Sequence, residues 1–310
     1  MSVALTVRVA ILGGGRGVAA VLRALRDAPV ALTAVVTTAD DGGSSGDLRR
    51  RFGGPAVGDL RRSLVALSDD TDLLATVMSQ PLETRYGRHP VGNLLIRSLT
   101  DSFGDLESSS RWLGPWLGIS GSVLPASVEP VTLLADTGDQ VIAGESAIGR
   151  NAERVLRLRF RPQWPRTPPA AVQAILAADW VLVAPGSLYT STLATCALPQ
   201  IVTAVANTPG RVLWLCNLEP EHAETTGMSA EDQLSALRRH GVRVDDVLYD
   251  PEAKLHFSPT TLARSRISGF AWPLQAGSGP IHDPRLLAAA LESVFAAQPS
   301  AVATAVGRGA

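Results

Sequence analysis

Short apolar runs alternate with amphipathic segments through the first fifty residues of the chain. Residues 7–12 (VRVAIL) form an unbroken apolar run that ends in glycines, which is typical of a strand buried on both faces of a sheet. Residues 17–27 carry apolar side chains at helical spacing with arginines between them, and residues 32–38 form a second, β-branched run. The three segments predict a β-α-β unit and therefore a parallel sheet with right-handed crossovers.

Helical patterns separated by turn signals, such as the stretch 86–90, fill the next part of the chain. We expect helices at residues 59–67, 72–78, 93–99 and 106–117. Near residue 122 the pattern changes to a two-residue alternation around the turn signal at residues 136–139 (DTGD). Residues 121–150 therefore predict a small antiparallel ribbon that is an excursion from the main domain and not a part of the parallel sheet.

Strands and helices alternate again in the second half of the chain. The expected strands lie at residues 155–160, 180–184, 212–215 and 244–249, and the expected helices at residues 168–178, 230–239 and 284–297. This order predicts an α/β fold with a mainly parallel sheet and one β-rich lobe. We expect a single domain over residues 1–297 and a frayed, Ala/Gly/Ser-rich tail over residues 298–310.

Composition then excludes several classes of protein. The chain has 310 residues, of which 45% are hydrophobic, and this is enough for a full core. The net charge of -1 creates no general attraction to nucleic acid or to an anionic membrane, whereas a small anionic ligand stays open. No segment reads as a secretion signal or approaches the ~20 apolar residues of a membrane span, so we expect a cytoplasmic protein. Cys196 and Cys216 are expected to be buried free thiols.

The first polar loop follows the first predicted strand and opens a helix. It consists of Gly13, Gly14, Gly15, Arg16 and Gly17. The backbone N–H groups at a helix N-terminus favour a phosphate, and Arg16 adds a bidentate cation. The dinucleotide pattern fails, because its third glycine would stand at Val18, and no Gly-Lys-Ser/Thr of a P-loop follows. A phosphate contact and a purely structural glycine turn are therefore both open.

The second polar loop follows the second predicted strand and comes before a helix that we expect to begin at Asp47. It contains Asp40, Asp41, Gly42, Gly43, Ser44 and Ser45. The two aspartates admit three roles: they ligate Mg²⁺ that bridges to a phosphate, accept hydrogen bonds from sugar hydroxyls, or cap turns and the next helix.

The same loop matches the G-x-S-x-G nucleophile elbow of α/β-hydrolases over residues 42–46. Three residues intervene between the strand and this pattern, and no histidine stands beside a strand end at the required place in the chain order. The sequence therefore argues against a serine hydrolase.

Further polar residues follow later strands or stand at helix starts. The third loop supplies Gly186, Ser187, Tyr189, Thr190 and Ser191, and the fourth supplies Asn217 and the segment 224–227. Asp59, Arg61, His89 and Asn93 lie at or near predicted helix starts. Asp59 is alternatively a simple N-cap, and His89 is not expected to bind metal because no second histidine or cysteine lies at usable spacing.

Taken in order, these segments resemble a known family over nearly the whole chain. The segments are GGGRG, TTADDGGSSGDLRR, VGDLRRSLVAL, HPVGNLL, VLPASVEPVTL, APGSLYTS, CNLEP with AETTGMSAEDQL, and PIHDPRLLAAAL. They resemble the gluconeogenesis factor (YvcK-like) family, within the superfamily of the 2-phospho-L-lactate transferase (CofD-like). The resemblance implies a Rossmann-like three-layer α/β/α fold and a ligand of the nucleotide-sugar kind, such as UDP-N-acetylglucosamine.

The two branches of that superfamily imply different activities. YvcK-like proteins regulate growth, cell shape and envelope synthesis according to the carbon source and have no clear catalytic activity. CofD-like proteins transfer a phospholactyl-type group from a nucleotide diphosphate donor with Mg²⁺, and in that case Asp40, Asp41 and Asp59 would hold the metal. The longer fingerprint favours the first branch, so we expect a regulatory binding protein with an unknown protein partner.

On this hypothesis the loops at Gly13–Gly17 and Gly186–Ser187 hold a diphosphate, and the loop around Thr226 closes over the base. Two departures from the family pattern bear on affinity. Arg16 replaces a threonine in the first loop, and Met228, after Gly227, replaces a residue that is often aromatic and would stack better on a base. Apolar helices such as residues 94–99 serve either a homodimer face or the core.

Overall fold

Seven parallel strands form the central sheet of the protein, in the order β12-β11-β10-β9-β1-β2-β5. Our computed structural model describes residues 6–151, 153–221, 223–265, 267–275, 277 and 279–297, so the predicted tail at 298–310 lies outside the described residues. The strands are β1 (Val7–Gly13), β2 (Val30–Val36), β5 (Ser122–Pro125), β9 (Trp180–Val183), β10 (Arg211–Leu215), β11 (Asp246–Tyr249) and β12 (Ser268–Ala271). The predicted α/β fold with a mainly parallel sheet is confirmed.

The direction of chain progress across the sheet reverses between β1 and β9. From β1 the chain moves through β2 to β5, and it then returns to place β9 on the other side of β1, followed outward by β10, β11 and β12. The helices that follow β1 and β9, α1 (Gly15–Leu25) and α9 (Leu193–Cys196), therefore lie on opposite faces of the sheet. In open parallel sheets such a switch point is where ligands bind.

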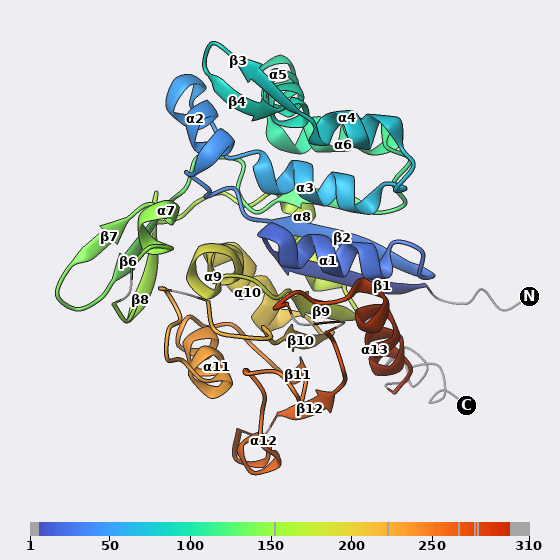
Figure 1. Ribbon diagram of the computed structural model, residues 1–310, viewed down its shortest axis with the longest axis vertical. Coiled ribbons are helices and arrows are strands. Elements are labelled where there is room, and N and C mark those ends of the chain that lie inside the picture. Colours follow the sequence, from blue (N-terminus) through green and yellow to red (C-terminus); the bar gives the residue numbers. More distant parts are fainter. Residues whose placement is uncertain are drawn as a thin grey trace, which may run out of the picture.

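Helices cover both faces of the sheet and make two separate cores (Figure 1). On one face lie α1 (Gly15–Leu25), α3 (Gly58–Leu67) and α13 (Pro284–Ala296), and on the other lie α8 (Pro169–Ala177), α9 (Leu193–Cys196), α10 (Pro199–Asn207) and α11 (Ala230–Arg239). Strand β1 shows the division, because Ile11 enters the first core and Leu12 the second. This two-sided burial explains the unbroken apolar run in the sequence.

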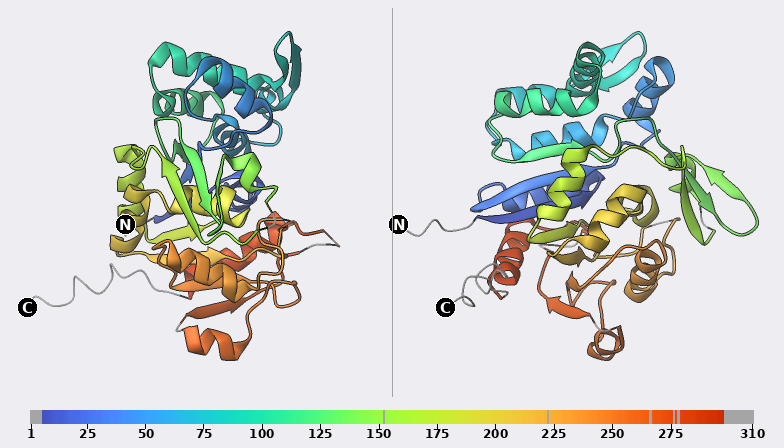
Figure 2. Two further views of the ribbon diagram at one scale, coloured as in Figure 1. Left: turned by 90° about the vertical axis from the view of Figure 1, so that its left-hand side faces the viewer. Right: turned by 180° about the vertical axis from the view of Figure 1, so that it is seen from behind.

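A helical layer extends the domain at one end (Figures 1 and 2). It contains α2 (Gly43–Phe52), α4 (Leu73–Ser79), α5 (Val91–Phe103), α6 (Leu106–Trp116) and a hairpin of β3 (Pro81–Thr84) with β4 (Gly87–Pro90). Helix α2 begins four residues before the predicted start at Asp47, because the Gly-Ser-Ser-Gly run forms its first turn. Leu94, Leu95 and Leu99 of α5 pack on the core, which favours the core role that we had left open for residues 94–99.

The antiparallel lobe has different bounds from the predicted 121–150. It consists of β6 (Thr132–Asp136), β7 (Val141–Ala143), α7 (Glu145–Ile148) and β8 (Arg157–Arg161), in the sheet order β7-β6-β8. The prediction was wrong for residues 122–125, which form β5 and pair in parallel with β2 at the sheet edge. A short apolar run has no periodicity that distinguishes an edge strand from a ribbon strand.

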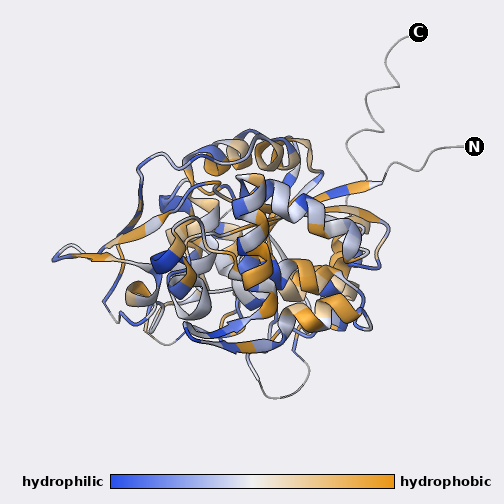
Figure 3. Cartoon of the chain, turned by 90° about the horizontal axis from the view of Figure 1, so that it is seen from above, coloured by the Kyte–Doolittle hydropathy of each residue, from blue (hydrophilic) through white to orange (hydrophobic). Residues whose placement is uncertain are grey.

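The remaining elements are the π-helix η1 (Leu188–Thr192), which runs into α9, and α12 (Pro259–Ser265). Hydrophobic and hydrophilic residues alternate within single helices, as expected where one side faces a core (Figure 3). Among the described residues no single helix is both long and apolar enough to cross a membrane, and only the bent pair of segments 188–196 and 199–207 reaches that length together.

Candidate functional site

The loops after β1 and β9 lie against each other at the switch point. A Cβ added to Gly15 would stand 3.7 Å from Ser191 Oγ, and one added to Gly186 would stand 3.7 Å from the Gly14 carbonyl oxygen. A Cβ on Gly17 would come within 1.7 Å of the Pro185 carbonyl oxygen. Gly15 also has φ +65°, which favours glycine. The two glycine-rich loops that we predicted separately thus form one surface.

Asp59 occupies part of the anion position at the N-terminus of α1. Its Oδ2 accepts a hydrogen bond of 3.0 Å from the Gly15 N–H, and its Oδ1 pairs with Arg62. Helix α3 starts at Gly58 after Val57, so Asp59 is not the N-cap of its own helix. Burial raises the pKa of Asp59 above its usual range, while Arg62 and the Gly15 N–H oppose that shift. The side chain of Arg16, which is exposed, remains available to an incoming anion.

Asn217 fixes the loop after β9 by two hydrogen bonds. Its Oδ1 accepts from the Gly186 N–H at 2.7 Å, and its Nδ2 donates to the Gly186 carbonyl at 2.8 Å. From α9, Thr195 Oγ1 donates to the Gly13 carbonyl at 2.8 Å and so ties α9 to the end of β1. Asn217 is therefore a positioning residue for the loop, and direct contact with a ligand is not needed to explain it.

Asp41 caps a helix in another part of the fold. Its Oδ1 accepts a hydrogen bond of 2.9 Å from the Ser146 N–H in the first turn of α7. Gly144 has no room for a Cβ, which would lie 2.4 Å from Asp41 Oδ2. Asp40 Oδ1 instead closes a local turn by accepting from the Gly42 N–H at 2.8 Å. The predicted turn-capping role is thus seen for Asp40, whereas the next helix, α2, has no side-chain cap and Asp41 caps α7 instead.

Arg49 fastens the aspartate loop to the antiparallel lobe. Its guanidinium donates to the carbonyls of Ala39 and Asp40 at 2.9 Å each and to the carbonyl of Val131 at 2.8 Å. Burial lowers the pKa of Arg49, and the charges of Asp41 and Asp40 oppose that change. Together with the Asp41 cap, these bonds hold the loop and the lobe in one arrangement.

A chain of hydrogen bonds joins α3, α5, α2 and β4. Arg61 Nε donates to Asn93 Oδ1 at 3.0 Å, Asn93 Nδ2 donates to Ser44 Oγ at 2.9 Å, and Ser44 Oγ lies 2.9 Å from His89 Nδ1. The other ring nitrogen of His89 lies 3.3 Å from the Tyr86 carbonyl oxygen. The sequence argument that no histidine is placed to serve this serine was wrong, because the β3–β4 hairpin brings His89 to Ser44 from 45 residues away.

Two glutamates complete the acidic side of the site: Glu145, which the sequence analysis did not select, and Glu224, which stands in the fourth predicted loop. Burial and the nearby charges of Asp40 and Asp41 raise the pKa of Glu145 to about 7. Burial, followed by the charge of Glu221, raises the pKa of Glu224 to about 8. Glu224 Oε1 accepts from the Tyr189 N–H at 3.3 Å, whereas its Oε2 has no hydrogen-bond partner among the described residues. No sequence pattern marks Glu145, because it comes near Asp40 and Asp41 only when the antiparallel lobe folds against the aspartate loop.

Five of the predicted ligand-binding residues are buried, packed on the core or exposed, and no contact among the described residues places their side chains at this surface. Tyr189 is fully buried and donates its hydroxyl proton to the Val155 carbonyl at 3.0 Å, so it is a core residue. Thr226 and Gly227 are exposed, and Met228 packs partly against the core. Ser45 is buried beside Gly58, where an added Cβ would lie 2.4 Å from its Oγ. The remaining predicted residues, Ser187 and Thr190, lie in the loop and helix after β9.

The acids do not form a metal cage by themselves. Among the described residues no group of three or more His, Cys, Asp or Glu side chains is close enough to hold an ion. Asp41 and Asp59 already accept backbone hydrogen bonds and Asp59 pairs with Arg62. Mg²⁺ commonly takes one or two carboxylates together with substrate phosphates. Among the described residues the acids therefore provide no all-protein magnesium site.

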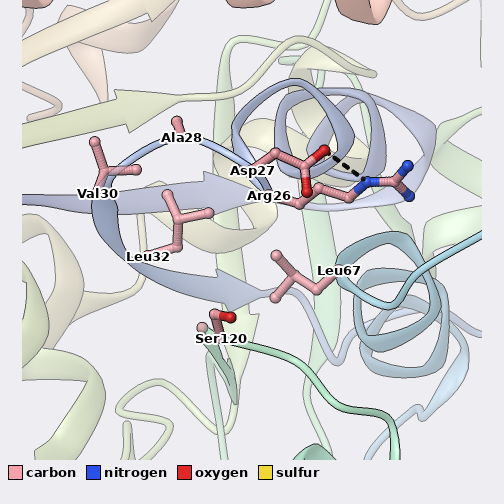
Figure 4. A pocket seen from close by; sticks show the side chains of 8 residues that line it. Arg26, Asp27, Ala28, Val30, Leu32, Leu67 and Ser120 are labelled. Atoms are coloured by element: carbon pink, nitrogen blue, oxygen red, sulfur yellow. Dashed lines mark ion pairs between the residues drawn. The ribbon is translucent and has the colours of Figure 1, made fainter.

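Two hollows lie away from the switch point. One, of about 340 Å³, is at the amino ends of β2 and β5 and is lined by Arg26, Val30, Leu67 and Ser120 among others (Figure 4). A second, of about 680 Å³, runs along β5 between α6 and α8. The switch point differs from both hollows, because two glycine-rich loops meet there beside exposed Arg16.

Comparison with known proteins matches most of the chain to one family. The model of the family described as 2-phospho-L-lactate transferase CofD matches residues 9–265. The chain is 37% identical over 249 residues to the gluconeogenesis factor of Halalkalibacterium halodurans, covering 79% of this chain and 77% of that protein. It is 36% identical to the putative gluconeogenesis factor of Mycobacterium tuberculosis over 313 residues, covering 92% and 89%.

A solved structure agrees with the fold. The crystal structure of a UPF0052 family protein from Bacillus halodurans superimposes with a TM-score of 0.87 at 31% sequence identity. The match covers 92% of this chain and 99% of that chain.

Proposed function

The chain belongs to the 2-phospho-L-lactate transferase CofD family, in its gluconeogenesis factor (YvcK-like) branch, and from this membership and the site we propose that it binds a nucleotide sugar and acts as a regulatory protein. The ligand class is UDP-N-acetylglucosamine or a close relative. Its binding is proposed to report carbon supply to the machinery of growth, cell shape and envelope synthesis. The names of the relatives support the link to carbon metabolism.

The single observation that carries this proposal is the meeting of two glycine-rich loops at the switch point. Gly13–Gly17 and Gly186–Ser191 are held in contact, with the helix N-terminus of α1 and exposed Arg16 beside them. A diphosphate needs close backbone approach, N–H donors and one cation, and the two loops supply all three. Asp40 is proposed to accept hydrogen bonds from the sugar or ribose hydroxyls, whereas Asn93, which is buried and bonded to Arg61 and Ser44, has a positioning role.

Calorimetry tests the proposal directly. UDP-N-acetylglucosamine, UDP, GDP and NAD⁺ are titrated into the full-length protein, with and without EDTA. We expect UDP-N-acetylglucosamine to bind and Asn217→Ala to weaken that binding at least tenfold, because Gly186 loses both bonds from Asn217. Asn207→Ala, at the exposed end of α10, is the matched control. Absence of binding by every nucleotide at millimolar concentration would refute the proposal.

A second candidate is a Mg²⁺-dependent transferase that uses a nucleotide diphosphate donor. The observation that favours it is the group of acids, Asp40, Asp59 and Glu145, whose charges act on one another beside the phosphate loops. Magnesium would neutralise the leaving diphosphate and would be held by Asp40 and Glu145. On this view Asp59 orients the first loop through the Gly15 N–H.

Turnover separates the two candidates. Donor hydrolysis or transfer that needs Mg²⁺ and disappears in Asp40→Asn would establish the transferase. If EDTA leaves nucleotide affinity unchanged and mass spectrometry finds no product from the donor with phosphorylated or hydroxylated acceptors, the binding protein stands and the transferase does not.

A further inference from the structure

The Ser44–His89 pair has the geometry of an activated nucleophile, which neither proposed function uses. Ser44 is the serine of the G-x-S-x-G pattern at residues 42–46, and it lies in the first turn of α2. Its Oγ is 2.9 Å from His89 Nδ1. A serine and a histidine at this distance are the two parts that nucleophilic catalysis requires.

The surroundings of His89 set the direction of that hydrogen bond. Its Nε2 faces the Tyr86 carbonyl oxygen, which accepts only, so Nε2 carries the proton and Nδ1 is left as an acceptor. The Ser44 hydroxyl therefore donates to Nδ1. His89 is 1% exposed, so the ring is held in this orientation by its packing.

Asn93 and Arg61 position the serine from the other side. Asn93 Nδ2 donates to Ser44 Oγ at 2.9 Å, so the hydroxyl oxygen accepts one bond while it donates another. Arg61 Nε in turn donates to Asn93 Oδ1 at 3.0 Å, which fixes the amide so that its NH₂ group faces Ser44. The proton of Ser44 is thereby directed at His89, and one lone pair of Oγ remains for attack.

The position of Ser44 in the fold also favours an oxyanion. The backbone N–H groups of the first turn of α2 have no side-chain cap, and this ten-residue helix directs the positive end of its dipole toward them. Buried groups surround His89, while Ser44 itself is only half-buried and reachable from solvent. Two features differ from the nucleophile elbow of a hydrolase. Ser44 lies within the first turn of α2 and not on a strained turn between a strand and a helix. The Tyr86 carbonyl, and not a carboxylate, faces the second ring nitrogen of His89.

We propose that Ser44 is a nucleophile that accepts an acyl group from an ester, with His89 as its general base and Asn93 and Arg61 as positioning residues. Ser44 Oγ forms a bond to the carbonyl carbon while its proton moves to His89 Nδ1. The ester C–O bond then breaks, and the leaving alcohol takes that proton from His89. Water that attacks the acyl-serine, with His89 again as base, restores the free serine and releases the acid.

Two probes test the step without knowledge of the natural ester. p-Nitrophenyl acetate reports acyl transfer by release of p-nitrophenolate, and a fluorophosphonate forms a stable phosphonyl-serine as fluoride leaves. We expect one adduct per chain, located on Ser44 by peptide mass spectrometry, and at least a hundredfold slower labelling in His89→Gln. Ser44→Ala is expected to abolish labelling, while Ser102→Ala, an exposed serine without a histidine, keeps it.

A loss of fold in His89→Gln would be detected by circular dichroism and the melting temperature. In that case Asn93→Asp and Arg61→Lys replace it, and both are expected to slow labelling at least tenfold while the melting transition remains cooperative. The proposal fails if folded wild-type protein gives no adduct, if the adduct forms on another serine, or if folded variants in this hydrogen-bond chain are labelled as fast as wild type. Nucleotide binding by the same samples is measured separately, so the two proposals stand or fall independently.

Discussion

Gly17 has no room for a side chain in the folded protein. A Cβ at this position would lie 1.7 Å from the Pro185 carbonyl oxygen, so the start of α1 and the end of β9 would have to separate. We expect Gly17→Ala to destabilise the fold by about 1–3 kcal/mol, as overpacking does, and to abolish nucleotide binding. Chemical denaturation and calorimetry measure both effects.

The matched control is Gly279→Ala, because a Cβ at Gly279 meets nothing within 4 Å and its φ does not require glycine. We expect this variant to bind and unfold like wild type. Wild-type affinity in Gly17→Ala would show that the contact between the two loops does not shape the site.

Glu224 makes stability depend on pH. Burial raises its pKa from 4.5 to about 8, so the folded state holds this proton more tightly than the unfolded state. The stabilisation is complete below about pH 4.5 and is lost as pH rises through about 8. At ~1.4 kcal/mol per pKa unit the loss is at most roughly 4–5 kcal/mol.

We therefore expect the melting temperature to fall between pH 5 and pH 8, and Glu224→Gln to remove much of that decline and to be more stable than wild type at pH 8. Glu292→Gln, an exposed acid on α13, should follow the wild-type curve. Parallel curves for wild type and Glu224→Gln would contradict the assignment of the shift to this residue.

The sequence indicated which residue types lie in the polar loops, but it did not indicate which residues they contact in the folded protein. The glycine runs and Asn217 were identified by their position after strands, and Asp59 by its position at a predicted helix start. Asp41 was ambiguous because its partner, the Ser146 N–H, is 105 residues away. Tyr189 was assigned to the ligand because a hydroxyl in a polar loop looks available, whereas the fold buries it against the Val155 carbonyl.

At the scale of elements, Arg49 links helix α2 to two other segments. Its guanidinium holds the carbonyls of Ala39, Asp40 and Val131, so one side chain sets the position of the aspartate loop relative to the lobe. Arg49→Met keeps the packing of the stem and removes all three bonds. We expect nucleotide affinity to fall at least tenfold and amide exchange to accelerate at residues 39–42 and 144–146.

Arg51→Met is the matched control, since Arg51 is exposed on the same helix and its guanidinium lies over the ring of Tyr86 at 4.6 Å from the ring centroid. Its affinity and exchange should stay at wild-type levels. Unchanged exchange at both segments in Arg49→Met would mean that the Asp41 cap alone holds the lobe.

Elements with a clear period were predicted, and short ones were not. The strands buried on both faces and the amphipathic helices follow directly from spacing, as in β1 and α11. The four-residue strand β5 was assigned to the ribbon, and the β3–β4 hairpin was taken as turn signals alone. That hairpin places His89 beside Ser44. Because the hairpin was not predicted from the sequence, the contact between these two residues was not predicted either.

At the scale of the whole molecule, the proposed ligand surface lies at the switch point between β1 and β9. Segments 13–17 and 185–191 are far apart in sequence and adjacent in space, and α3 contacts the first of them through Asp59 and the Gly15 N–H. A ligand that spans the switch point must protect both segments at once. This distinguishes it from a ligand in the hollow at the amino ends of β2 and β5, which is lined by Arg26, Leu67 and Ser120.

Hydrogen exchange with saturating UDP-N-acetylglucosamine measures that difference. At about a hundred times Kd the ligand adds ~2.7 kcal/mol to the free energy of unfolding, and we expect slower exchange at residues 13–17 and 185–191 together. Residues 26–30 and 119–121, around the hollow, serve as the internal control and should be unchanged. The sheet separates the hollow from the switch point. Protection confined to residues 26–30 and 119–121 would therefore place the ligand in the hollow and overturn the switch-point site. Protection of only one glycine loop would show that the ligand does not bridge the two loops.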